Sequence, residues 1–227
     1  MNITHKIQIA GIQDWEEAEL IRSNGADFLG FPLRLPVNSV DLEEDEATQI
    51  IQQSSLPSIL ITYQDRANDV IAFCKQMGCN NIQLHGEITT SELEKLKGKA
   101  PNIFVIKSLV ISPEKENLKR LKQQIDEQKA FVDAFILDTH NPATGADGAT
   151  GLTHDWSISR ELVQYSPRPV IMAGGMNPKN VAEAILFVRP AAVDVHTGVE
   201  AENGRKCPQK LNQFIHEAKR AFALLYD

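Results

Sequence analysis

Positive charge and long apolar runs are both scarce in this chain. Its 227 residues include 23 Lys and Arg against 30 Asp and Glu, a formal charge of −7, which disfavours an extended basic surface for nucleic acid. No apolar run approaches the roughly 18 residues that cross a bilayer, and the first residues lack a secretory hydrophobic stretch. We therefore expect a cytoplasmic protein that binds neither nucleic acid nor membrane.

Cysteine is also sparse. Cys74, Cys79 and Cys207 form an odd set with no paired C-x-x-C units, so the sequence indicates neither a disulfide framework nor a zinc site. Cys74 falls in an expected helix and Cys79 just after it, which favours burial over reactivity. The first expected strand also lacks the G-x-G-x-x-G of a dinucleotide site. We expect no metal and no cofactor.

What the chain does contain is a regular alternation of short β-branched runs and longer helical patterns, in an ordinary globular composition of 42% hydrophobic residues. Eight such units in 227 residues fit a closed (β/α)₈ TIM barrel better than a doubly wound sheet, so we predict one TIM-barrel domain over residues 1–227. The expected strands are Ile7–Ile12, Asp27–Leu33, Ser58–Tyr63, Asn81–His85, Ile103–Leu109, Ala134–Thr139, Pro169–Ala173 and Ala191–Val195.

Helix punctuation separates these strands. The first helix should begin at Asp14 and end at Gly25, and later ones should span Leu42–Gln53, run from about Arg66 to Gly78, and cover Ser91–Leu96. Starts are also expected at Pro113, Asp155, Asn177 and Cys207. The last helix, Gln209–Tyr226, has an apolar stripe that favours packing onto the barrel over a dimer seam. Monomer and homodimer both remain open.

In such a barrel, side chains at the carboxyl ends of the strands converge on one mouth. The polar and titratable residues expected there include Arg34 after the second strand, Gln83 and His85 on the fourth, Asp138 on the sixth and His196 after the eighth. This set supplies groups for proton transfer and for binding a polar ligand.

Two glycine-containing turns follow the seventh and eighth strands, at Gly174-Gly175 and at Thr197-Gly198. In many barrels these two loops hold a phosphate together at a helix N-terminus, and glycine lets backbone N–H groups approach the anion. Each turn alone is also explained by tight-turn geometry, but the adjacent pair favours a phosphate site. A third cluster, Gly145 to Gly151, has the composition of a lid, although flexibility alone also accounts for it.

Taken in order, these residues resemble the phosphoribosylanthranilate isomerase family of tryptophan biosynthesis over nearly the whole chain. The matching stretches are Gly25-Ala26-Asp27, Gln83-Leu84-His85-Gly86-Glu87, Val105-Ile106-Lys107, Leu137-Asp138-Thr139, Gly148 to Gly151 leading to Asp155-Trp156-Ser157, Gly174 to Val181, Arg189-Pro190, and Val193-Asp194-Val195 with Gly198-Val199-Glu200.

The resemblance implies an Amadori rearrangement of a phosphorylated ribose derivative, an aldose-to-ketose isomerisation that uses no cofactor. An acid protonates the furanose ring oxygen, the ring opens to a Schiff base, and a base removes the sugar C2 proton. By this resemblance the acid is Asp138, and the phosphate lies on Gly174, Gly175, Thr197 and Gly198, with Gly151 as a further contact. A carboxylate that caps the following loop is the structural alternative for Asp138.

The chain departs from the family where the base should be. The family's first strand reads K-[IV]-C-G-[IL] with the cysteine as base, whereas this strand reads Gln8-Ile9-Ala10-Gly11-Ile12, so both the thiol and the lysine two places before it are absent. The family's P-x-S-x-R after the second strand, whose arginine binds the anthranilate carboxylate, is replaced by residues 36–40 ending in Val40.

Other residues offer substitutes. Arg34 lies near the missing arginine and has the bidentate fork that binds a carboxylate, with a solvated loop arginine as the alternative. His85 is our first candidate base and His196, which replaces a family serine, the second; a structural histidine bonded across the barrel is the other reading of His85. With Gln83, Arg34 and His196 are the expected substrate contacts.

Because the departures cluster at the reacting carbon while the phosphate loops and the acid match, the sequence predicts an isomerase of this type with a changed substrate or base. The alternative is a non-catalytic phosphosugar sensor or partner protein on the same barrel.

Overall fold

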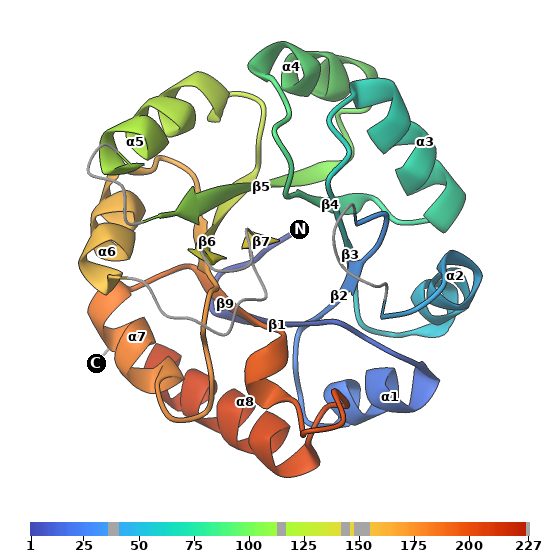
Figure 1. Cartoon of the computed structure of the whole chain (residues 1–227), viewed down its shortest axis with the longest axis vertical. Helices are drawn as coiled ribbons and strands as arrows, with labels where there is room; N and C mark the ends of the chain where they lie inside the picture. The colour runs from blue at the N-terminus through green and yellow to red at the C-terminus, as the bar shows by residue number, and fades with distance from the viewer. Residues whose placement is uncertain (36–40, 113–116, 142–145, 148–154, 226–227) are drawn as a thin grey trace.

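The computed structural model describes residues 1–35, 41–112, 117–141, 146–147 and 155–225, and the statements below concern these. Eight parallel strands form a ring in which each pairs with its neighbours and β5 also pairs with β6, which closes the sheet into the predicted (β/α)₈ barrel (Figure 1). The strands are β1 (Lys6–Ala10), β2 (Phe28–Pro32), β3 (Ser58–Thr62), β4 (Asn81–Leu84), β5 (Phe104–Ile111), β6 (Ala134–Asn141), β8 (Val170–Met172) and β9 (Ala192–Val195).

The helices surround this sheet, and successive helices lie beside one another around the ring (Figure 1). They are α1 (Trp15–Ser23), α2 (Glu44–Gln53), α3 (Ala67–Met77), α4 (Thr90–Lys99), α5 (Asn117–Gln128), α6 (Trp156–Tyr165), α7 (Val181–Val188) and α8 (Pro208–Ala223). The sequence did not reveal two short elements, β7 (Ala146–Asp147), which pairs antiparallel with β6, and the 3₁₀ turn η1 (Thr197–Val199).

Local capping explains most helix boundaries. The N–H of Glu17 donates to Asp14 Oδ1 (2.9 Å) at the start of α1, and Gly78 ends α3 in the left-handed region at φ 65°. Several boundaries differ from the prediction, and two of the differences are large. Thr89 caps α4 and lengthens it to Lys99, while the segment from Asn177 forms a turn so that α7 begins only at Val181.

Alternation along the strands divides the core into two layers. One layer lies between sheet and helices and contains Ile7 and Ile9 of β1; the other fills the barrel and contains Phe28, Ile106 and Ile136. Each fully buried side chain of this size contributes about 1.5–3 kcal/mol. Because Gln8 and Ala10 alternate with Ile7 and Ile9, they face the barrel interior, where the chemistry of this fold is placed.

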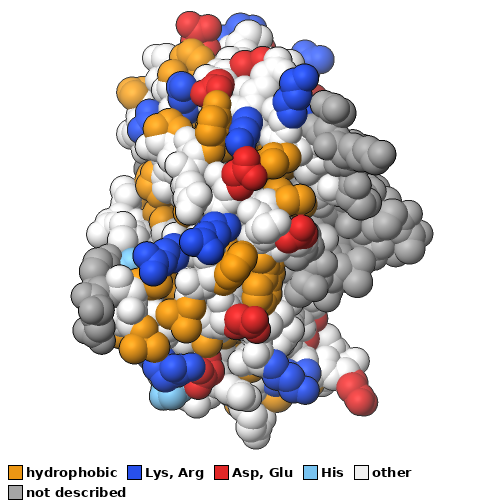
Figure 2. Space-filling model, turned by 90° about the vertical axis from the view of Figure 1, so that its left-hand side faces the viewer, with side chains coloured by type: hydrophobic (Ala, Val, Ile, Leu, Met, Phe, Trp, Pro, Cys, Tyr) orange, Lys and Arg blue, Asp and Glu red, His pale blue; other side chains and the backbone are white. Residues whose placement is uncertain are grey.

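The predicted burial of Cys74 and Cys79 is confirmed, and burial raises the pKa of the Cys74 thiol to about 12. The apolar stripe of α8 is buried against the barrel, as expected, through Leu211, Phe214 and Ala218. No helix within the described part of the chain has the length and apolarity to cross a membrane. On the side shown in Figure 2, acidic and basic side chains are interspersed with hydrophobic ones.

Candidate active site

A cavity opens at the carboxyl ends of β6, β8 and β9. It brings together the acidic residue predicted on the sixth strand and both predicted glycine loops. Its lining residues are Asp138, Ala173, Gly174, Gly175, Met176, Asp194, Val195, His196, Thr197 and Gly198.

The loop after β8 has the geometry of an anion-binding turn. Gly174 and Gly175 both have positive φ (79° and 64°), a conformation that glycine adopts without steric penalty. Among the described residues, the N–H groups of these two glycines have no hydrogen-bond partner, so both can donate to an anion. A Cβ on Gly174 would lie 2.1 Å from Thr139 Oγ1, so this loop packs directly against the residue that follows Asp138.

The loop after β9 abuts the first one. A Cβ on Gly198 would lie 1.8 Å from the carbonyl oxygen of Met176, so only glycine allows the two backbones to approach this closely. Thr197 begins the short turn η1 and is exposed beside the cavity. The two loops therefore form one wall, made largely of backbone.

Asp138 stands on β6 beside this wall. Its side chain is 6% exposed, and Oδ1 accepts a hydrogen bond from the Thr139 N–H (2.8 Å). A buried carboxyl group in the same cavity as the phosphate loops is positioned for proton transfer to a bound phosphosugar.

A second carboxyl group, that of Asp194 on β9, lines the same cavity and was not among the predicted site residues. Burial and the negative charge of Asp138 raise the pKa of Asp194 to about 8, against opposing contributions from Lys206 and Gln8. The signal was present in the sequence: an acidic residue interrupts the apolar strand Ala192–Val195 on the side that faces the barrel.

The first strand supplies no proton acceptor at the mouth. Ala10 is buried, and a Cβ on Gly30 of β2 would lie 3.0 Å from the Ala10 methyl, so this part of the interior is tightly filled. Gln8 reaches across the barrel, where its Nε2 donates to Gln83 Oε1 at 3.4 Å. The structure thus places Gln83 within the barrel but not among the residues that line the cavity.

His196 lines the cavity close to β1. Its ring occupies the space that a side chain on Gly11 would need, since a Cβ there would lie 1.9 Å from Nε2. Nε2 faces Glu200 Oε1 at 3.4 Å and Asp41 Oδ2 at 3.6 Å. Burial and the nearby charge of Lys206 lower the pKa of His196 to about 3, so the imidazole is neutral at physiological pH.

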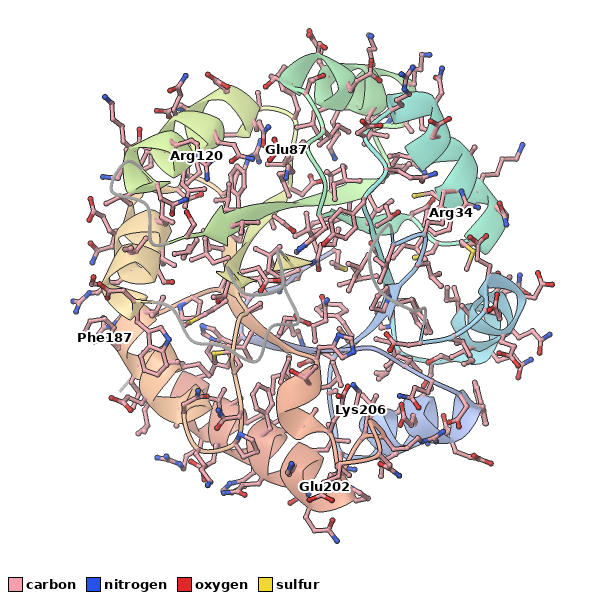
Figure 3. The ribbon with its side chains drawn as sticks, in the orientation of Figure 1. Arg34, Glu87, Arg120, Phe187, Glu202 and Lys206 are labelled. Carbon is pink, nitrogen blue, oxygen red and sulfur yellow. The ribbon has the colours of Figure 1, made fainter. Side chains whose placement is uncertain are left out.

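Lys206 and Glu200 lie next to this histidine. Lys206 Nζ is buried and donates to Glu200 Oε1 (2.7 Å) and to the carbonyl oxygen of His196 (3.3 Å). Figure 3 shows Lys206 between α8 and α1, on the β1 side of the ring. Because the cation is satisfied by these partners, it fixes the His196 backbone rather than entering the cavity.

His85, our first candidate base, lies elsewhere. Its Nδ1 is 2.8 Å from Ser108 Oγ on β5, and its ring meets Tyr63 edge-on with a centroid separation of 5.0 Å. It does not line the cavity. Its partner Ser108 lies on β5, the strand that pairs with β4, so this contact joins neighbouring strands.

Arg34 is also placed differently from our expectation. Its guanidinium makes a bidentate pair with Glu44 (2.7 and 2.9 Å), donates to Gln76, and lies 4.2 Å from the Phe73 ring centre. Figure 3 shows it among α2 and α3, outside the barrel. Its Nε and Nη2 donate to side chains of α2 and α3, and Arg34 is not among the residues that line the cavity described above.

Other predicted elements cannot be placed. Gly151, most of the glycine cluster 145–151 and residues 36–40, including Val40, lie outside the described residues. Within the described ranges, no group of three or more His, Cys, Asp or Glu residues is arranged to hold a metal ion.

Comparison with known proteins agrees with this geometry. Residues 7–217 match the family model described as N-(5'-phosphoribosyl)anthranilate (PRA) isomerase. The chain is 37% identical over 221 residues to N-(5'-phosphoribosyl)anthranilate isomerase 2 of Methanosarcina mazei, covering 96% of this chain and 95% of that protein. It is 33% identical over 234 residues to the isomerase of Methanosarcina acetivorans, covering 98% and 97%.

Solved structures of this family have the same fold. The phosphoribosyl anthranilate isomerase of Thermotoga maritima superposes with a TM-score of 0.78 at 29% identity, covering 95% of this chain and 98% of that one. A phosphoribosyl anthranilate isomerase in complex with reduced 1-(o-carboxyphenylamino)-1-deoxyribulose 5-phosphate superposes with a TM-score of 0.77 at 28% identity, with the same coverage.

Proposed function

Since the chain belongs to the N-(5'-phosphoribosyl)anthranilate isomerase family, we propose that it catalyses the aldose-to-ketose isomerisation of a phosphorylated ribose derivative. The observation that carries this proposal is the single cavity that contains both Asp138 and the two glycine loops. This cavity supports the proposal because the reaction needs a proton-transfer group and an anion-binding wall within reach of one small molecule.

In this proposal the phosphate accepts hydrogen bonds from the N–H groups of Gly174 and Gly175, with Thr197 and Gly198 on its other side. Asp138 provides the acid that protonates the ring oxygen, which breaks the C1–O bond and leaves a Schiff base. A base then takes the C2 proton, and the bonding electrons move to give the enolamine, which tautomerises to the ketose. No electron acceptor is needed.

For the base, the geometry of the cavity favours His196 over His85. His196 lines the cavity on the side of β1, where the family carries its cysteine, and it is neutral. A neutral imidazole can accept a proton, but one whose pKa is so low is a weak base. We therefore propose His196 as the base of a slow isomerase.

A second candidate function, a phosphosugar sensor without turnover, is favoured by one specific observation. Ala10 occupies the family's cysteine position, and its methyl group accepts no proton. A phosphate wall with no working base binds ligand but leaves it unchanged.

The two functions are separated by measuring binding and turnover on the purified chain. We expect the isomerase to convert phosphoribosylanthranilate, monitored by the loss of anthranilate fluorescence, and to exchange the sugar C2 proton for deuterium. Asp138→Asn should reduce kcat by at least about 100-fold and leave thermal stabilisation by ribose 5-phosphate in place. Asp65→Asn, the same change at an exposed position, is the matched control.

Complementation of a tryptophan auxotroph that lacks the isomerase tests the same activity in cells. Stabilisation by phosphosugars without turnover or exchange would contradict the isomerase and support the sensor. We place the protein in the cytoplasm, where the phosphorylated substrates of such a reaction are made, as a monomer or homodimer.

A further inference from the structure

Two buried acceptor atoms on neighbouring strands lack donors. Gln8 on β1 and Asp194 on β9 are paired in the strand register, so their side chains enter the barrel side by side. Among the described residues, Gln8 Oε1 and Asp194 Oδ1 have no hydrogen-bond partner although both atoms are buried. Buried acceptors without a donor cost free energy in the folded protein. A proton on the Asp194 carboxyl group would supply the missing donor.

The charges around Asp194 also favour a proton there. Asp138 on β6 adds negative charge across the cavity, and Lys206, whose charge opposes this effect, is engaged by Glu200 and the His196 carbonyl. At position 8 a neutral amide faces the carboxyl group directly. A lysine there, as in the family's first strand, would instead hold the carboxylate ionised.

We propose that Asp194 rests as a neutral carboxylic acid beside the Gln8 amide, and that Asp138 and Asp194 together hold one proton in the cavity at neutral pH. Two coupled carboxyl groups that share a proton present a donor and an acceptor at the same time. Asp138, proposed as the acid, then acts with the proton that it shares with Asp194, so in a site without the family's thiol the two carboxyl groups take part in catalysis together. This catalytic use rests on the proposed function, whereas the presence of the proton does not.

Infrared spectroscopy of the ligand-free protein tests the proton directly. Near pH 6, ordinary Asp and Glu side chains are ionised, so we expect a protonated carboxyl C=O band in the wild type that disappears in Asp194→Asn. The band should remain in Asp65→Asn and in Asp41→Asn; the second control is needed because burial also raises the pKa of Asp41. A wild-type spectrum without the band, or a band that Asp194→Asn leaves unchanged, overturns the proposal.

A second experiment tests how the pKa of Asp194 depends on the residue at position 8. Titration should remove the band around pH 8 in the wild type, and Gln8→Lys should move the midpoint down by at least about one pH unit. Gln8→Met, similar in size but uncharged, should not lower it. Circular dichroism checks that each variant folds; if Gln8→Lys does not, Asp138→Asn replaces it and should also lower the midpoint because it removes the neighbouring charge. A midpoint unmoved by the added or removed charge contradicts the proposal.

These spectra are recorded without substrate, so their result is independent of the turnover assay. A protein that holds the proton but catalyses no isomerisation would refute the proposed function alone. An active isomerase without the band would refute the proton assignment alone.

Discussion

The two sides of the barrel mouth differ in how they are built. The wall formed by the loops after β8 and β9 consists of backbone, held by close contacts at Gly174 and Gly198. The adjoining side, formed by β1 and β2, is lined by side chains such as Gln8 and Ala10 that project into the barrel. The first side matches the family pattern, and the second departs from it.

A binding site made of backbone groups and one made of side chains respond differently to substitution. A phosphate held by N–H groups depends on the path of the chain, which a Cβ at either close contact would disturb. An interior side chain on β1 can be exchanged for one of similar or smaller volume while the barrel stays folded. The chemistry of β1 can therefore change while the anion-binding wall is kept.

The largest effect should come from removing the proposed base on the border of the two sides. We expect His196→Asn to reduce kcat by about 100-fold, the low end for a general base because the imidazole is weakly basic. His85→Asn, matched in chemistry but outside the cavity, should reduce kcat by less than about tenfold. Steady-state kinetics of both variants measures this. Equal losses would return His85 to the site.

The pH dependence of kcat/KM also tests the proposed role of His196. The pKa of His196 is lowered to about 3 in the folded protein, so the group stays neutral as the pH falls from 7 to 5. We therefore expect no loss of kcat/KM from this histidine across that window. A limb near the ordinary histidine pKa that vanishes in His196→Asn would contradict the lowered pKa, because kcat/KM reports the ionisation of groups in the free enzyme.

One methyl group added at Gly198 should disrupt the wall formed by the loops after β8 and β9. Gly198→Ala places a Cβ 1.8 Å from the Met176 carbonyl oxygen, so the loops must separate. We expect at least about a tenfold weaker affinity for ribose 5-phosphate, equivalent to about 1.4 kcal/mol, measured by calorimetry. Gly98→Ala on α4, where nothing lies within 4 Å, is the control and should leave affinity unchanged while stabilising the fold by up to about 1 kcal/mol.

Restoring the family's thiol on β1 should raise the isomerase activity. Ala10→Cys introduces a proton acceptor at the family's position, and we expect kcat to rise by about tenfold if the surrounding geometry is retained. Ala10→Ser adds similar volume without an acidic thiol and should give no increase. The close contact with Gly30 allows only a small addition here. No increase in the cysteine variant would show that the site differs by more than the base.

The smallest effect should come from Arg34, which lies outside both sides. Arg34→Ala removes its pair with Glu44, in which both side chains are partly solvent-exposed, and its contact with the buried Phe73 ring. We expect a loss of unfolding free energy of about 1 kcal/mol in urea titrations, with ligand affinity unchanged. A large loss of substrate affinity with normal stability would restore Arg34 as a substrate contact.

Several features of the site were predictable because they depend on local pattern. The order of strands and the glycine turns are enough to place Asp138, Gly174 and Gly198 at one end of a barrel. His85 and Arg34 were not predictable in the same way. Each follows a strand in the sequence, but the partners that engage them, Ser108 on β5 and Glu44 on α2, come from other strands and helices.

By itself the sequence determined the eight strand-helix units, the closed barrel and the positions of the two glycine loops. These follow from hydrophobic period and turn chemistry, which act between residues near in the chain. Only the tertiary structure decided that Asp194 faces Asp138, that Gln8 lies beside Asp194, and that His196 rather than His85 enters the cavity. Those outcomes depend on register and distance between strands far apart in the chain, and burial there changes which groups keep a proton.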